Sequence, residues 1–182
     1  MTDEAFADFC AEHPESRFEL SPLGELIEMP LSSAWTSVRN CEIAGQLGNW
    51  SRKDKRGFVL GSSGGWRLPN TAVRAAAAAW ISRDRIDRMA PESLHRFWTA
   101  VPNLVIEQRY STDNAGTVHA RMEEWLSVGV QLAWLVDPDA RTVEVYRPGR
   151  EAAITGAAAV RGEGPVEGFV LDLAPVWDPL AD

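Results

Sequence analysis

Cysteine and histidine are scarce in this chain, and their scarcity excludes several kinds of site. Two cysteines, Cys10 and Cys41, stand far apart among 182 residues, and three histidines are present. A disulfide framework needs more cysteines, and a zinc site needs cysteines or histidines at short spacing. Because none of the histidines stands in a recognisable nucleophile motif, a serine or cysteine hydrolase is also disfavoured.

Long hydrophobic runs are lacking as well. The longest, Ala75 to Ile81, is mostly alanine and far shorter than the roughly 20 residues that a transmembrane helix needs. The acidic N-terminus has no basic leader before an apolar stretch. We therefore expect no membrane segment and a cytoplasmic location.

Positive charge is in deficit. The chain has 18 lysines and arginines against 26 acids, a net charge of −8, which argues against indiscriminate coating of nucleic acid. A local basic patch is compatible with this balance, and cations gather in two segments: Arg52, Lys53, Lys55 and Arg56, then Arg83, Arg85 and Arg88. Each cluster alone is more often a solvated helix face than a binding surface.

The rest of the composition suits a folded core. A length of 182 residues and a hydrophobic content of 45% fit one α/β or α+β domain, residues 1–182. Apolar spacing and capping residues predict helices over residues 2–13, 32–53, 82–88, 91–97 and 113–128. Alternation and turn residues predict strands over residues 17–20, 25–29, 58–60, 66–68, 72–81, 104–109, 132–136, 142–147 and 152–155, the first two forming a hairpin.

Five consecutive alanines, Ala75–Ala79, make the strand over residues 72–81 the least obvious of these predictions. Alanine has high helix propensity and poor strand propensity. The flanks favour a strand, because a turn precedes the run and Trp80–Ile81 leads into a new helix start at Ser82. We predict a strand, since pairing with neighbours can override the propensity of five residues.

The predicted strand over residues 104–109 carries the candidate chemistry. Side chains alternate along a strand, so Val105, Glu107 and Arg109 share one face. Nucleases with a Glu-x-Lys strand need a carboxylate and a cation on one face, because the acid holds a divalent metal and the cation stabilises charge on phosphate. A solvated ion pair on a half-exposed strand is the simpler alternative.

Two helices place further charged residues beside apolar surfaces. Glu42 borders a face of small residues on the helix over residues 32–53, where close packing would partly dehydrate its carboxylate. Arg121 projects from the apolar side of the helix over residues 113–128, where a carboxylate such as Glu107 could pair with it. For both residues, a charged tip that reaches solvent at the helix edge is the alternative.

Five ordered motifs connect the chain with a known family. They are Phe18-Glu19-Leu20 with Gly24 to Met29, Arg39 to Ile43, Arg67 to Asn70, Pro102 to Glu107, and Gly129 to Pro138. With these motifs the chain resembles, over nearly its whole length, a bacterial family of restriction-endonuclease-like proteins in the PD-(D/E)xK nuclease superfamily. The resemblance implies a mixed β-sheet flanked by helices with an N-terminal hairpin, a Mg²⁺ or Mn²⁺ site, homodimers, and hydrolysis of DNA phosphodiester bonds.

The resemblance also implies roles for particular residues. Glu42 matches the family's helix carboxylate, Glu107 matches the metal-binding acid of the strand motif, and Arg109 takes the place of the lysine in Glu-x-Lys. Arg121 falls where many members supply a lysine from the following helix. The family's metal-binding aspartate falls at Ala77, and Glu42, Ala77 and Glu107 are expected to meet at one cavity.

The missing acid at Ala77 leaves two functional classes open. Mg²⁺ needs oxygen ligands in near-octahedral geometry, and arginine, unlike lysine, cannot give up a proton. The chain is either a metal-dependent endonuclease with weak or no activity, or a catalytically silent module that binds DNA or a protein partner. Ala77 itself is either natural or an introduced replacement of an aspartate.

Overall fold

A mixed sheet of six strands, in the order β10-β9-β8-β7-β6-β3, forms the centre of the computed structural model, which describes residues 1–181 except the side chain of Asp3. The strands are β3 (Gly57–Gly61), β6 (Ala78–Ser82), β7 (Leu104–Gln108), β8 (Leu132–Asp137), β9 (Thr142–Tyr146) and β10 (Ala153–Thr155). β7 and β8 run parallel, and the other neighbours pair antiparallel. The predicted α+β class with a mixed sheet is confirmed.

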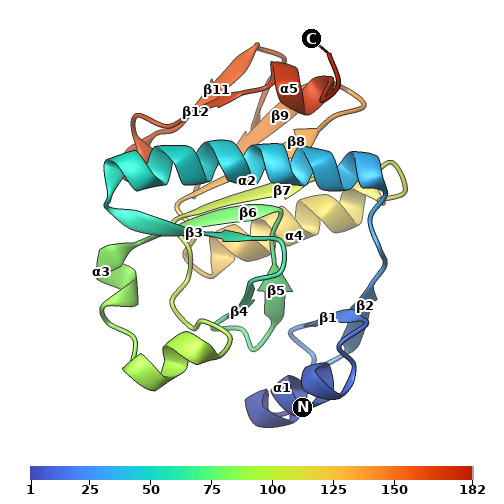
Figure 1. The fold of residues 1–182 in the computed structure, drawn as a ribbon, viewed down its shortest axis with the longest axis vertical. Coiled ribbons are helices and arrows are strands. Elements are labelled where there is room, and N and C mark those ends of the chain that lie inside the picture. Colours follow the sequence, from blue (N-terminus) through green and yellow to red (C-terminus); the bar gives the residue numbers. More distant parts are fainter. Residues whose placement is uncertain (182) are drawn as a thin grey trace.

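Two helices cover opposite faces of this sheet (Figure 1). α2 (Ala34–Asp54) packs on the face that contains Ile106, and α4 (Ala115–Ser127) packs on the face that contains Val105. Successive side chains on β7 point to opposite faces of the sheet. Glu107, which follows Ile106, therefore faces α4.

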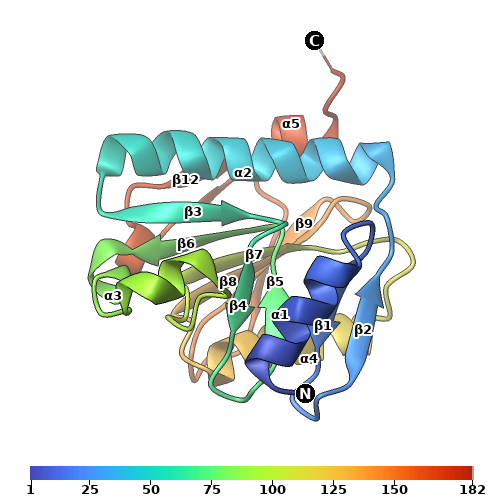
Figure 2. The same ribbon diagram turned by 60° about the horizontal axis from the view of Figure 1, so that its bottom comes forward.

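A second sheet of four strands, in the order β2-β1-β5-β4, joins the N-terminal hairpin to the middle of the chain (Figure 2). Its strands are β1 (Arg17–Leu20), β2 (Leu26–Met29), β4 (Gly65–Arg67) and β5 (Val73–Ala75). β1 and β2 form the predicted hairpin, which turns through Gly24 at a φ of +77°, a conformation that glycine adopts without strain. α1 (Asp3–Glu12) packs Phe6 against Leu20 and Val73 of this sheet.

The remaining elements are short. They are α3 (Arg83–Ile86), the 3₁₀ helices η1 (Pro91–His95) and η2 (Gly164–Val166), the strand pair β11 (Ala159–Arg161) and β12 (Val170–Asp172), and α5 (Ala174–Trp177). Val160, Leu171 and Val176 from the last three elements extend the core on the α2 side of the large sheet. No helix in the described part of the chain is both long and apolar enough to cross a membrane.

The alanine run forms parts of two strands, not the single strand predicted over residues 72–81. Ala75 ends β5 in the small sheet, Ala76 and Ala77 form an irregular connection, and Ala78 begins β6 in the large sheet. Ala76 is 3% exposed and Ala77 is 6% exposed, so both are buried although they belong to no strand. Small side chains suit this connection, because the backbone passes here from one sheet to the other.

Gly57, at the start of β3, lies against the buried indole of Trp80. A Cβ added at Gly57 would lie 2.4 Å from Cζ2 of Trp80 and 2.3 Å from the carbonyl oxygen of Ile81. We expect Gly57→Ala to lower the free energy of unfolding by about 2 kcal/mol or more in urea denaturation. Gly61→Ala is the control, because no atom lies within 4 Å of its added Cβ, and it should change stability by less than about 0.5 kcal/mol. Equal losses for the two variants would contradict the close packing at Trp80.

Candidate functional site

A cavity of about 580 Å³ opens between the small sheet, the end of β7 and α4. Its lining includes three of the residues singled out from the sequence, Ala77, Glu107 and Arg121. Glu19 from β1 and Arg74 from β5 add further charged groups to the wall. Of the three residues expected to meet here, Glu42, Ala77 and Glu107, the cavity therefore brings together Ala77 and Glu107, with Arg121 beside them.

Arg121 lies at the centre of these charged groups. Its Nε donates to Oε1 of Glu107 at 2.7 Å, and its two terminal nitrogens donate to the two oxygens of Glu19 at 2.7 and 2.8 Å. Nη2 also donates to the carbonyl oxygen of Ala75. These hydrogen bonds engage most of the N–H donors of the guanidinium. Of the two alternatives that the helix pattern left open for Arg121, the structure shows the ion pair with Glu107.

Glu107 is held by two donors from α4. Besides the bond from Arg121, its Oε1 accepts from Nε1 of Trp125 at 2.9 Å, and its side chain is 12% exposed. Arg121 and Trp125 are four residues apart, so one face of the helix presents both donors to the strand. The alternative of a half-exposed, solvated Glu107 is therefore wrong.

Burial and charge act in opposite directions on the ionisable groups of the cavity. Burial raises the pKa of Glu19, but the hydrogen bond and charge of Arg121, with the N–H of Ala75, bring that pKa below its ordinary value. Burial lowers the pKa of Arg121, but the charges and hydrogen bonds of Glu107 and Glu19 bring it above its ordinary value. Each group therefore holds the other in its charged form at neutral pH.

Arg74 extends the network of ion pairs to Glu124, near the C-terminal end of α4. Its Nε donates to Oε2 of Glu124 at 2.7 Å, and its Nη1 donates to the carbonyl oxygen of Leu20 at 2.8 Å and to Glu19 at 3.5 Å. Asn70 donates to the other oxygen of Glu124 at 2.9 Å. We call this network the arginine cluster; it consists of Glu19, Arg74, Glu107, Arg121 and Glu124.

Glu42 does not reach the cavity. It lies on α2, across the large sheet from α4, and its carboxylate accepts from Nε2 of Gln46 at 3.0 Å. Gln46 in turn bonds to the main chain of Asp172. Helical spacing shows which helix face a residue shares, but not on which side of the sheet the helix packs. The predicted meeting with Ala77 and Glu107 is therefore wrong for Glu42.

Arg109 also lies outside the cavity. β7 ends at Gln108, although the N–H of Arg109 still donates to the carbonyl oxygen of Val136 at 2.8 Å. The guanidinium of Arg109 donates to Oδ2 of Asp137 at 2.7 Å, and its side chain is 38% exposed. Alternation predicts a shared face only while a strand continues, which is why the prediction that Arg109 lies on the face of Glu107 is wrong. The alternative of an ion pair between the two residues is also wrong, because Arg109 pairs with Asp137.

The residues around the cavity do not fit a Mg²⁺ or Mn²⁺ ion in this arrangement. Across residues 1–181, no group of three or more Asp, Glu, His or Cys side chains is placed to hold a metal. Ala77 offers no oxygen, and the carboxylates of Glu19 and Glu107 accept hydrogen bonds from Arg121. Such an ion usually takes one or two carboxylates together with water and phosphate. Here the guanidinium lies between the two acids where a cation would bind.

Glu19, Arg74 and Glu124 were not among the candidates from the sequence. Glu19 lies between two apolar residues in the Phe18-Glu19-Leu20 motif, and an acid in such a strand needs a partner if it is buried. That signal could have singled out Glu19. Its partner Arg121 is 102 positions away, so no local spacing connects the two residues.

Gly61–Gly65 matches, letter by letter, the Gly-x-Ser-x-Gly pattern of serine hydrolases, with Ser63 as the central serine. The segment forms the turn between β3 and β4, whereas a nucleophile elbow joins a strand to a helix. Ser63 and His95 line one open cavity and are both exposed, but no hydrogen bond joins them within the described residues. The serine hydrolase class therefore stays disfavoured.

The chain has a mixed sheet with helices on both faces and an acid-bearing strand at its centre, the arrangement expected of a restriction-endonuclease-like fold. The crystal structure of a putative nuclease of the DUF820 family from Anabaena variabilis ATCC 29413 has this fold, with a TM-score of 0.74 and 18% sequence identity over 92% of this chain and 93% of that one. The model of a family described as "Putative restriction endonuclease" matches residues 3–174, and the chain belongs to this family. A comparison with curated proteins finds no match.

Proposed function

We propose that this chain is a nuclease-fold protein that binds DNA without hydrolysing it. The observation that carries the proposal is the position of Arg121, whose guanidinium bonds both Glu19 and Glu107 on the cavity wall that Ala77 shares. Metal-dependent hydrolysis needs an ion that polarises phosphate and activates a water molecule. A guanidinium supplies positive charge, but it has no open coordination position and does not give up its proton.

The family supports DNA as the ligand, because its description is that of restriction endonucleases. Arg121 lines the cavity, but Glu19 and Glu107 already accept hydrogen bonds from its guanidinium, so the support for DNA as the ligand comes from the family. A cytoplasmic location belongs to the same proposal, and cell fractionation tests it.

A weak metal-dependent endonuclease is the second candidate function. Glu107 stands at the end of a central strand on the wall of an open cavity, as such a reaction requires. In this case Mg²⁺ or Mn²⁺ would be the cofactor, and the ion would have to displace Arg121 from Glu107. Because Ala77 has no carboxylate, the ion would still have one protein ligand fewer than the family's motif supplies.

Nicking of supercoiled plasmid DNA separates the two candidates. The unsubstituted chain is expected to retard DNA in a gel with EDTA present and to leave the plasmid intact when Mg²⁺ or Mn²⁺ is added. Divalent-dependent nicking that disappears in Glu107→Ala would overturn the proposal and establish the weak endonuclease. Failure to retard DNA at low salt would refute the DNA-binding half of the proposal.

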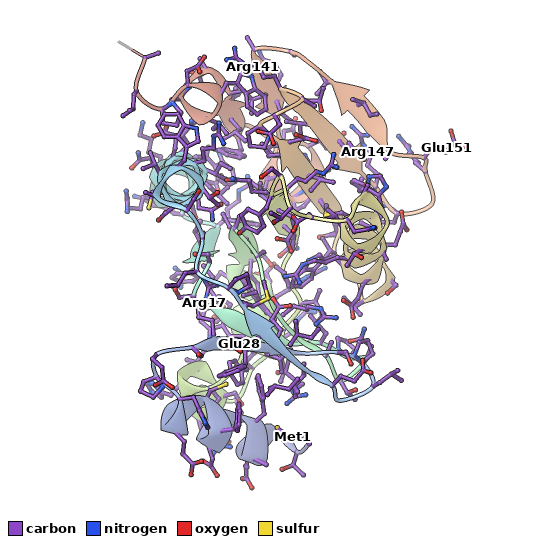
Figure 3. The ribbon with its side chains drawn as sticks, turned by 90° about the vertical axis from the view of Figure 1, so that its right-hand side faces the viewer. Met1, Arg17, Glu28, Arg141, Arg147 and Glu151 are labelled. Atoms are coloured by element: carbon purple, nitrogen blue, oxygen red, sulfur yellow. The ribbon has the colours of Figure 1, made fainter. Side chains whose placement is uncertain are left out.

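We also propose a homodimer that forms along the exposed edge of the small sheet. β2 is an edge strand, and the apolar residues from β2 into α2 are unusually accessible: Leu26 is 41% exposed, Ile27 38%, Leu31 96% and Trp35 40%. An edge strand with exposed apolar side chains favours pairing with another chain. Figure 3 faces this side, with Glu28 labelled on β2.

Sedimentation equilibrium tests the dimer. It should give a dimer for the unsubstituted chain and a monomer for Ile27→Lys with Leu31→Lys. A monomer in both cases would refute the dimer.

A further inference from the structure

Two basic segments that are separate in the sequence lie side by side at one corner of the large sheet (Figures 1 and 2). Residues 52–56 end α2 and lead into β3, and residues 83–88 follow β6 and include α3. β3 pairs with β6, and beyond their ends the N–H of Arg83 donates to the carbonyl oxygen of Arg56 at 2.8 Å. We call these two segments the basic corner.

Positive charge is concentrated at the basic corner. Its two segments hold seven lysines and arginines against three aspartates, a local charge of +4 in a chain whose net charge is −8, so the other residues carry −12. Asp54 is already paired with Arg56 at 2.8 Å. Glu167, whose carbonyl oxygen accepts from Arg56 at 3.4 Å, borders the corner and adds one negative charge at its rim. A polyanion is therefore attracted to this corner, whereas the rest of the chain carries the opposite net charge.

An open groove of about 600 Å³ borders the corner, with Arg85 and Arg88 in its wall. Arg85 is fixed in place, because its Nη1 donates to the carbonyl oxygens of Val101 at 2.8 Å and Pro102 at 3.1 Å. Burial, and then the charge of Arg88, lower the pKa of Arg85, but arginine keeps its proton at neutral pH. Two guanidinium groups that repel each other, one of them immobile, are stabilised by an anion that contacts both.

Other cations of the corner are accessible to a ligand. Lys53, Lys55 and Arg88 are exposed, and their side chains make no hydrogen bond or ion pair with any residue that the structure describes. Arg83 lies over the ring of Phe58, with 4.7 Å between its Cζ and the ring centroid. This cation–π contact holds the guanidinium at the surface and leaves its N–H donors available.

We propose that the basic corner and its groove bind the sugar–phosphate backbone of duplex DNA. The choice of DNA as the partner rests on the proposed function. The clustered lysines and arginines would contact the phosphate backbone of DNA whatever its base sequence. The groove shares no lining residue with the cavity of the arginine cluster. Binding at the corner therefore needs no working metal centre and survives the loss of nuclease chemistry.

Fluorescence anisotropy with a short labelled duplex, at low salt with EDTA, tests the corner. Lys53→Glu with Arg88→Glu removes one exposed cation from each segment and should weaken binding about tenfold or more. Arg150→Glu with Arg161→Glu is the matched control: both residues are exposed and lie outside the corner, and either pair of reversals takes the net charge from −8 to −12. The control should weaken binding by less than about threefold.

The outcomes of this experiment and of the plasmid assay are independent. Equal losses for the two double variants would overturn the corner as a site, because total charge alone would then govern binding. Tighter binding of anionic lipid vesicles than of DNA at the same salt would overturn the choice of partner. If the corner variant keeps full DNA affinity while the plasmid stays intact, the silent DNA-binding function stands and the corner is refuted.

Discussion

Restoring an acid at position 77 is expected to give the protein divalent-dependent nicking of plasmid DNA. Ala77→Asp adds a carboxylate to the cavity wall that holds Glu107. Arg121→Lys removes the planar guanidinium that donates hydrogen bonds to both Glu19 and Glu107. The double variant thereby offers a divalent ion two carboxylates, those of Glu107 and the new aspartate, within the one or two that it usually takes. Because a bound metal stabilises the transition state by several kcal/mol, nicking should rise at least about a hundredfold over the unsubstituted chain.

Two further variants show whether the gain comes from a metal. Ala77→Asn with Arg121→Lys has nearly the same side-chain volume without the charge and should stay at background. Adding Glu107→Ala to the active double variant should remove nicking. Titration calorimetry with Mn²⁺ separates binding from chemistry. Metal binding without nicking would support an interaction module, and no metal binding would show that the missing acid and Arg121 are not what silences the chain.

The parts of the site that could be predicted from sequence are those that a single element determines. Strand alternation placed Glu107 on one face of β7, and helical spacing placed Arg121 on the apolar side of α4, where the two form an ion pair. The order of motifs gave the mixed sheet and the hairpin. The positions of Glu107 and Arg121 follow from periods of two and of 3.6 residues, which a sequence displays directly. The mixed sheet follows instead from the resemblance of the ordered motifs to a known family.

The parts that could not be predicted depend on how separate elements pack. Glu42 has the expected helical position, but α2 covers the face of the sheet opposite to Arg121. Glu19 joins the cluster only because β1 pairs with β5 and brings its carboxylate under α4. Arg109 is excluded because β7 ends one residue earlier than predicted. These outcomes are set by contacts between residues that are far apart in the chain.

Removing the guanidinium of Arg121 is expected to be the most destabilising of the changes considered. In Arg121→Met, the side chain of Glu19, 3% exposed, and that of Glu107, 12% exposed, lose the cation they share. A buried charge left without its partner costs about 3–5 kcal/mol, so the free energy of unfolding in urea should fall by that amount at neutral pH. Arg109→Met is the matched control, because Arg109 is 38% exposed, and its loss should stay below about 1 kcal/mol.

The pH dependence of this loss distinguishes an unpaired acid from a packing defect. In the unsubstituted chain the pKa of Glu19 lies below its ordinary value, so Glu19 stabilises the fold above that value, and this contribution is lost as the pH falls through the lowered pKa. In Arg121→Met burial is opposed only by the N–H of Ala75 and the charge of Arg74, so the pKa of Glu19 should rise and the stability deficit should shrink as the pH falls. A deficit that is constant from neutral to acidic pH would instead indicate lost packing of the arginine stem. Glu19→Gln with Glu107→Gln in the Arg121→Met background should recover most of the loss at neutral pH, because the cost comes from the charges of two buried acids that have lost their shared cation.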